Sequence, residues 1–289
     1  MLRKQKIVIV ADFFVDEYWG GAELSTDALI QCAPEDFDII KIKSINVDSE
    51  KLSEHEYAFW IFTNFSAMPF YLIPRIVRSL EYAVVEYDYK YCWYRNPQLH
   101  KMEMHVDCNC NNQFVGDLFH NASAMIFMSS VQWKYVNERV NLTKSFGGKV
   151  LGSFFADSTL SKLAILRENP KSYRWAVVGS GSKGKGTSEN IKFCKDNDLS
   201  FEYFHGMQYA ELMQRLSRCK GLVFKPIGND TCPRLVIEAR LLGLELEINN
   251  FVEHTQDQWW WQDDITSYLK NNKHDFWKVI HGCLEKVGV

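Results

Sequence analysis

The stretch that decides the fold is GLVFKPIGNDTCPRLVIEA, residues 221–239. Its first four residues form a short apolar run, which is typical of a buried strand in a parallel sheet. A polar loop follows, and the spacing of the apolar residues after Pro233 predicts a helix that starts near Arg234. A buried strand joined to a helix by a polar loop is the repeating unit of an α/β protein.

Similar units lie on both sides of this stretch. Short runs of apolar and β-branched residues predict further strands at residues 6–10, 38–42, 58–63, 82–86, 124–128, 175–178, 201–204 and 244–248. Helical patterns alternate with them, among them residues 69–80, 111–121, 187–197, 209–219, 235–242 and 265–285. The alternation predicts an α/β fold with doubly wound parallel sheets and right-handed connections.

The alternation is interrupted once. Residues 157–172 read as a linker that contains a polar helix, and the strand pattern restarts at Trp175. A length of 289 residues suits one large or two medium domains, and the restart favours two. We predict a Rossmann-like domain at residues 1–156, a linker at 157–172 and a second Rossmann-like domain at 173–264. A helical segment at 265–289 is expected to pack back toward the first domain. Two such sheets that face each other bind ligands in the cleft between them.

The composition excludes several classes of protein. Because 33 Lys and Arg face 36 Asp and Glu, the formal charge is −3, which disfavours nucleic acid as a partner. A hydrophobic share of 46% excludes intrinsic disorder as the dominant state. No run of 18 apolar residues occurs, so no integral membrane segment is expected. The three tryptophans at 259–261 leave peripheral membrane contact open, although nearby acids oppose it.

The N-terminus predicts the compartment. The basic residues at 1–6 precede an apolar run, but Asp12 interrupts that run and no small-residue cleavage site follows. We therefore expect no secretory signal and a cytoplasmic protein, with the eight cysteines present as thiols. The sequence does not indicate the oligomeric state.

Glycine-rich loops after two predicted strands favour phosphate binding. Residues 179–186 read GSGSKGKG between a strand and a helix, and their backbone N–H groups, hydroxyls and lysines suit a diphosphate. The P-loop spacing is absent because Gly186 stands at the Ser/Thr position. Gly20 and Gly21 likewise precede a helix. The alternatives are a flexible loop at 179–186 and a simple turn at Gly20.

Two acids flank the helix start near Arg234. Asp230 lies in the loop, and Glu238 follows eight residues later, inside the helix. A carboxylate there is placed to accept hydrogen bonds from a ribose diol, while the loop and the helix N-terminus address sugar and phosphate. The alternative is that Asp230 is a turn residue and Glu238 part of a solvated helix face.

Together these motifs resemble retaining glycosyltransferases of the GT-B fold, family 4. The GGAE-type loop, the lysine and glycine after the 175–178 strand, and the acid-x7-Glu spacing carry the resemblance. It implies that a sugar passes from a nucleotide-diphosphate sugar, of the UDP or GDP type, to a saccharide or other hydroxyl acceptor. It also implies retention of configuration and no metal or other cofactor.

The resemblance implies a role for particular residues. The catalytic residues would be Asp230, Lys185 and Asp88. The donor would be bound by Gly20, Gly21, Gly179, Ser180, Lys183, Lys185, Thr231, Arg234 and Glu238. The acceptor, on the side of the N-terminal domain, would contact Tyr87, Tyr89 and Arg95.

Three departures from the family pattern support a rival interpretation. Ser180 stands where the family has an arginine, Tyr87 where a histidine is common, and Pro233 where a glycine is frequent. The first rival is therefore a catalytically degenerate protein that binds a sugar or nucleotide. The second is a Rossmann oxidoreductase, which the lack of an acid at the end of the second strand of either half disfavours.

Soft metal ligands gather within 19 residues, at Cys92, His100, His105, Cys108 and Cys110. Zinc sites usually contain C-x2–4-C pairs, and the C-x-C pair at 108–110 fits that spacing poorly. The spacing therefore disfavours zinc, and no metal is expected.

Overall fold

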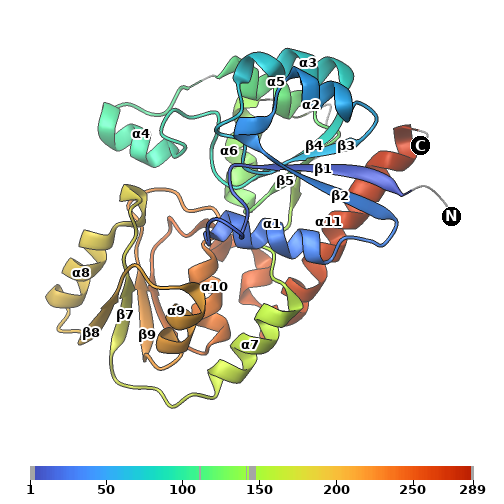
Figure 1. Ribbon diagram of the computed structural model, residues 1–289. Helices are drawn as coiled ribbons and strands as arrows, with labels where there is room; N and C mark the ends of the chain where they lie inside the picture. The colour runs from blue at the N-terminus through green and yellow to red at the C-terminus, as the bar shows by residue number, and fades with distance from the viewer. Residues whose placement is uncertain (1–3, 111, 141, 143–147, 288–289) are drawn as a thin grey trace.

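The computed structural model describes residues 4–110, 112–140, 142 and 148–287. It contains two parallel sheets, each flanked by helices (Figure 1). The N-terminal sheet has six strands in the order β2-β1-β3-β4-β5-β6, and the C-terminal sheet has four in the order β10-β9-β7-β8. The predicted α/β class is confirmed.

The elements of the N-terminal sheet follow the predicted alternation. Its strands are β1 (Gln5–Ala11), β2 (Phe37–Lys43), β3 (Phe59–Phe62), β4 (Glu81–Glu86), β5 (Ala124–Phe127) and β6 (Lys149–Val150). Its α-helices are α1 (Gly21–Gln31), α2 (Ser49–Glu54), α3 (Ile73–Ser79), α4 (Pro97–Met104), α5 (Gln113–Asn121) and α6 (Ser130–Val140). Short 3₁₀ turns are η1 (Ser44–Asn46) and η2 (Phe70–Leu72).

The C-terminal sheet follows helix α7 (Asp157–Arg167), which lies inside the predicted linker range. Its strands are β7 (Trp175–Val178), β8 (Phe201–Phe204), β9 (Gly221–Phe224) and β10 (Glu245–Ile248). Its helices are α8 (Thr187–Asp196), α9 (Tyr209–Leu216) and α10 (Arg234–Leu241). The 3₁₀ turns are η3 (Lys183–Lys185), η4 (Glu253–Gln256) and η5 (Gln258–Trp261), and α11 (Ile265–Val287) ends the described chain.

Apolar runs form the central strands because both faces of the N-terminal sheet are covered. Ile7, Ile9 and Ile61 face one hydrophobic cluster, which continues into the C-terminal sheet and α11. Val8 and Trp60, from the same strands, face a second cluster on the opposite side. The period of two along each strand divides the side chains between these cores. The parallel pairing brings the carboxyl ends of the strands to one edge, where the loops lie.

The last helix returns to the N-terminal sheet, as predicted. In Figure 1, α11 runs from the C-terminal half to the edge of β2, close to the chain's start. The Trp277 indole nitrogen donates a hydrogen bond of 3.0 Å to the Leu29 carbonyl, and the Trp277 ring packs on Phe37. Asn272 donates to the carbonyls of Leu151 and Ser153. Within the part of the chain described, no helix combines the length and the apolar character needed to cross a membrane.

A few elements differ from the sequence predictions. The helix predicted at 69–80 begins as the 3₁₀ turn η2 before α3, and β6 was not predicted at all. β6 pairs with β5 through only two residues, Lys149 and Val150, so it has too few residues to show a periodic pattern.

Removal of the Trp277 side chain tests the contact between α11 and the N-terminal sheet. We expect Trp277→Ala to lower the free energy of unfolding by about 3–5 kcal/mol, because a buried aromatic ring and its hydrogen bond are lost. The matched control is Trp261→Ala, whose ring is 73% exposed and whose loss is expected to change stability by less than about 0.5 kcal/mol. Equal effects of the two substitutions in urea unfolding would contradict the packing described.

A buried histidine predicts the response of stability to acid. His254 packs against the rings of Trp259 and Trp260, and burial, together with the charge of Arg240, lowers its pKa to about 3. The unfolded chain takes up this proton near pH 6.5, so the stability due to neutral His254 is present above that pH and is lost as pH falls. When the pH falls from 8 to 5, we expect protonation of His254 in the unfolded chain to lower the free energy of unfolding by about 2 kcal/mol. The free energy of unfolding of His254→Phe, measured in urea at both pH values, should fall by about 2 kcal/mol less than that of the unmodified protein. An equal fall in the two proteins would refute the role of His254.

Candidate active site

A cavity lies between the two sheets, at the carboxyl ends of their strands. It encloses about 430 Å³. The N-terminal side contributes loop residues that follow β1 and β4, and the C-terminal side contributes the loops after β7 and β9 together with α10. The predicted site residues that line it are Gly20, Gly21, Tyr87, Asp88, Gly179, Ser180, Lys185, Asp230, Thr231, Arg234 and Glu238. Segments more than 200 residues apart in the sequence therefore meet in one cavity.

Two glycines in the loops near the cavity, Gly20 and Gly186, leave no free space for a Cβ atom. A Cβ atom on Gly20 would clash with Glu23 Oε2 and lie 2.8 Å from the ring of Tyr18, so both side chains would have to move. Gly186 has a φ of +62°, and a Cβ there would lie 2.8 Å from the Lys225 carbonyl oxygen. This left-handed residue ends η3 and begins α8, so it turns the chain sharply after Lys185. The two loops can thus approach a ligand with their backbones.

Lys185 and Asp230 form an ion pair in the cavity. The lysine side chain is 36% exposed and the aspartate 12%, so the pair faces the open space rather than the core. Lys183, in contrast, pairs with Glu103 on α4 and does not line the cavity. Of the two lysines predicted to bind the donor, the structure brings Lys185 alone to the cavity wall.

Arg234 and Glu238 are buried on successive turns of α10. Arg234 stacks on the Phe155 ring, with its guanidinium carbon 3.8 Å from the ring centroid, and donates to the Phe154 carbonyl. Its Nε lies 3.5 Å from Glu238 Oε1, which also accepts a 2.8 Å hydrogen bond from Tyr209. Burial raises the pKa of Glu238, and the charge of Arg234 opposes that shift. Glu238 is therefore a buried carboxylate that Tyr209 and Arg234 hold in place and that can accept hydrogen bonds. The alternative interpretation, a solvated residue on the helix surface, is wrong.

Hydrogen bonds across the cavity connect the two sheets. Thr231 donates from its hydroxyl to the Tyr87 carbonyl at 2.7 Å, and the Tyr87 hydroxyl lies 3.0 Å from that of Thr26. Tyr87 is thus held between the loop that carries Asp230 and helix α1. The Tyr87 hydroxyl is therefore a fixed polar group at the position where the resembled family commonly has a histidine.

Asp88 belongs to a cluster of four ionisable side chains at the end of β4, with Glu86, Lys90 and Arg95. Burial favours its neutral form, but Lys90 and Arg95 outweigh this effect and lower the pKa of Asp88. Glu86 is fully buried, and burial raises its pKa to about 8 even with Lys90 3.4 Å away. Asp88 is therefore ionised at neutral pH, and Arg95 is occupied with neutralising it.

Two of the predicted acceptor residues do not line the cavity. Arg95 pairs with Asp88 and donates to Asn64, so it supports the cavity wall from behind. Tyr89 is fully buried, and its hydroxyl donates to Glu253 at 2.5 Å. Asp88 lines the cavity, but the side chain of the next residue, Tyr89, points into the core. Tyr89 therefore cannot contact an acceptor in the cavity.

Glu253 was not identified from the sequence, yet it connects the two halves. Its carboxylate accepts hydrogen bonds from Tyr89 and Ser129 on the N-terminal side and from Asn229 on the C-terminal side. Burial raises its pKa to about 7. An isolated glutamate in a 3₁₀ turn carries no sequence signal, because its three partners lie far away in the chain.

Two aromatic residues at the cavity were also missed. Trp19 directly precedes Gly20 and is 56% exposed beside the opening, and Tyr209 begins α9 with its ring 6.3 Å from that of Trp19. The signal that could have identified them is position: each lies in or directly after a loop at the carboxyl end of a strand.

Comparisons with known proteins identify the fold. The sequence matches no protein-family model and none of the curated proteins. Among solved structures, it is similar to Anabaena Alr3699/HepE in complex with UDP-glucose, at 12% identity over 98% of this chain and 99% of the other, with a TM-score of 0.53. The fold is GT-B.

Two further structures agree with this fold. An alpha-glucosyltransferase in complex with UDP-glucose and DNA containing an abasic site has 8% identity and a TM-score of 0.53, over 93% of this chain and 90% of the other. The trehalose-6-phosphate structure from E. coli bound with UDP-2-fluoro glucose has 8% identity and a TM-score of 0.54, over 93% and 91%. At these identities the similarity concerns the fold alone.

Proposed function

We propose that the protein is a glycosyltransferase that moves a sugar from a nucleotide-diphosphate sugar, of the UDP or GDP type, to a hydroxyl of a carbohydrate acceptor. The observation that carries this proposal is the convergence of Gly20–Gly21, the Lys185–Asp230 pair and the Arg234–Glu238 pair on one cavity. The similar HepE and E. coli structures hold UDP-glucose or its fluoro analogue, which supports a donor of this kind.

The donor is proposed to lie along the loops of the C-terminal sheet. Glu238 accepts hydrogen bonds from the ribose hydroxyls, and Lys185, Arg234 and the N–H groups after Gly179 stabilise the diphosphate. The transition state is oxocarbenium-like, and negative charge grows on the departing diphosphate. The fixed cations at the cavity stabilise that charge, so the proposed mechanism uses no metal.

The acceptor is proposed to enter from the N-terminal side, near Tyr87 and Asp88. The ionised Asp88 and the Tyr87 hydroxyl orient the attacking hydroxyl, and Asp230 contacts the donor sugar. With retention of configuration, the leaving phosphate itself assists removal of the acceptor proton. One similar structure is bound to DNA, but the net charge of −3 here favours a carbohydrate acceptor over nucleic acid. We place this activity in the cytoplasm, since none of the eight cysteines forms a disulfide in the structure.

A degenerate, binding-only protein is the second candidate. Ser180 and Tyr87 replace an arginine and a histidine of the resembled family, and Lys185 is paired with Asp230. A panel of nucleotide sugars, followed first by thermal shift and then by transfer and hydrolysis assays, separates the two. A donor present at 100 times its dissociation constant stabilises the protein by about 2.7 kcal/mol. Stabilisation without turnover would favour the binding-only protein, and stabilisation by NAD in place of nucleotide sugars would favour an oxidoreductase.

Glu238→Gln tests the ribose contact. We expect the affinity for the nucleotide sugar to fall between tenfold and a hundredfold, because hydrogen bonds to a charged acceptor contribute about 1.5–3 kcal/mol. The matched control is Glu211→Gln, an exposed glutamate on α9 outside the cavity. Calorimetry should show unchanged affinity for the control, and unchanged affinity for both variants would sink the assignment.

Lys185→Gln tests the diphosphate contact by a different comparison. We expect affinity for UDP or GDP to fall about tenfold or more, while affinity for the matching nucleoside stays the same, because only the former presents phosphate oxygens to the lysine. Lys192→Gln, which removes an exposed lysine of α8, is the control. An equal loss of affinity for nucleoside and nucleotide would show that Lys185 maintains the structure of the loop and does not contact the phosphate.

A further inference from the structure

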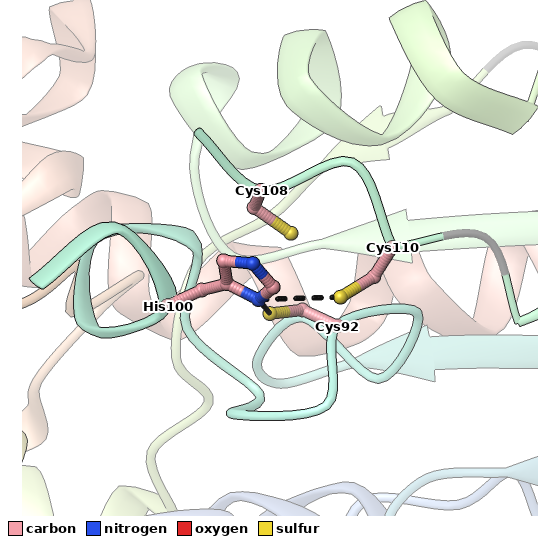
Figure 2. A group of neighbouring side chains, drawn as sticks. All are labelled: Cys92, His100, Cys108 and Cys110. Carbon is pink, nitrogen blue, oxygen red and sulfur yellow. Dashed lines mark hydrogen bonds between the residues drawn. The ribbon is translucent and has the colours of Figure 1, made fainter. Parts of the chain in front are cut away.

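Four metal-ligating side chains meet in the segment between β4 and α5. Cys92, His100, Cys108 and Cys110 point toward one another, as Figure 2 shows, and their ligand atoms all lie within 4.8 Å of one another. All four residues are buried. The cluster lies outside the cavity described above, and no step of the proposed transfer reaction uses it.

Local structure explains how four residues spread over 19 positions come together. The Arg95 N–H donates to the Cys92 carbonyl in a tight turn, and the Asn96 side chain then caps the N-terminus of α4. His100 lies inside α4, and the chain turns back after the helix through His105, which has a φ of 58°. In the returning segment Cys108 and Cys110 are buried while Asn109 between them is exposed, so both thiols point inward.

The distances suit a tetrahedral metal. His100 Nδ1 lies 3.3 Å from Cys110 Sγ and 3.9 Å from Cys92 Sγ. Ligands on a tetrahedral zinc, with Zn–S near 2.3 Å and Zn–N near 2.0–2.1 Å, are separated by about 3.6 Å. The thiol of Cys108 completes the group, since its sulfur lies within 4.8 Å of the ligand atoms of the other three residues. The site therefore needs only shifts of a few tenths of an ångström at these two contacts to enclose the ion.

We propose that Cys92, His100, Cys108 and Cys110 bind one Zn²⁺ ion in a closed, structural site. Thiolate sulfur and imidazole nitrogen are the ligands that zinc prefers, and four protein ligands leave no position for water or substrate. Three thiolates and the ion carry a net charge of −1. Arg139 lies beside the site, where its guanidinium donates a 3.0 Å hydrogen bond to the Cys108 carbonyl and partly offsets that charge.

The spacing argument disfavoured zinc because it considered only neighbours in the sequence. The C-x-C pair supplies two ligands, and the fold adds Cys92 from the loop after β4 and His100 from α4. His105, the fifth candidate, ends α4 at the surface and takes no part.

The zinc site stabilises a segment that contacts the C-terminal half. Asn96, four residues after Cys92, donates to the Asn229 carbonyl at 2.9 Å and accepts from the Asn229 N–H at 3.1 Å. Glu103, three residues after His100, pairs with Lys183 in the 179–186 loop. The ion thus fixes the short helix through which the N-terminal half touches the glycine-rich loop beside the cavity.

Metal analysis of the full chain, purified under reducing conditions and then titrated with Zn²⁺, tests the proposal. We expect one tightly bound zinc per chain, and X-ray absorption should show three sulfur ligands at about 2.3 Å and one nitrogen at about 2.0–2.1 Å. Cys92→Ala and Cys110→Ala should each lose the zinc, whereas Cys219→Ala, which removes an equally buried thiol outside the cluster, should keep it.

A second measurement covers variants that fail to fold. Co²⁺ titrated into the unmodified protein should produce the intense visible bands of tetrahedral cobalt and a thiolate charge-transfer band, with a sharp end point at one equivalent. The proposal is overturned if the reduced chain takes up no zinc or cobalt, or if absorption shows only oxygen ligands. It is equally overturned if thiol counting finds two of these cysteines joined as a disulfide in protein prepared with zinc. These readouts do not depend on glycosyl transfer, so they stand or fall apart from the proposed activity.

Discussion

The arrangement of the cavity depends on one buried carboxylate. Glu253 lies between the two halves and receives hydrogen bonds from Tyr89, Ser129 and Asn229. A carboxylate placed in such surroundings without donors would cost several kcal/mol, so the three partners must be present together. The backbone N–H of Glu253 also donates to the Asp230 carbonyl. The loop that carries Asp230 is therefore positioned against the N-terminal sheet by the same residue that joins the halves.

The electrostatics of the cavity follow from pairs of charges and not from an overall excess of cations. The chain is slightly acidic, yet Lys185 and Arg234 face the cavity, each with an acid beside it. Such pairs keep the cations in place without a ligand and leave the cavity close to neutral. A diphosphate would bring negative charge to cations that are already oriented, which is the condition under which fixed charges stabilise a leaving group best. Under the proposed function, fewer cations would stabilise the leaving diphosphate than in the resembled family, which has an arginine where Ser180 lies here.

Local sequence patterns were sufficient to predict the sheets and the glycine-rich loops. The strands at 175–178, 201–204 and 221–224 lie where the apolar runs predicted them, and Gly21, Lys185 and Glu238 do line one cavity. The patterns were insufficient wherever a side chain's direction depends on distant partners. Tyr89 points toward Glu253, Lys183 toward Glu103, and Cys92 toward His100 of the next helix. These contacts join residues that no repeating sequence pattern connects. Short pairings such as β6 fail for the related reason that two residues form no pattern.

The return of α11 to the first sheet also affects how the chain acquires its structure during synthesis. The strands β1–β5 emerge from the ribosome long before Trp277 and Asn272, whose side chains satisfy the carbonyls of Leu29, Leu151 and Ser153. Until α11 is translated, the face of the N-terminal sheet beneath it stays exposed, and the carbonyls of Leu29, Leu151 and Ser153 lack the donors that this helix supplies. The nascent N-terminal half is therefore an incomplete unit, and its core is closed by a helix that is translated after the whole C-terminal sheet.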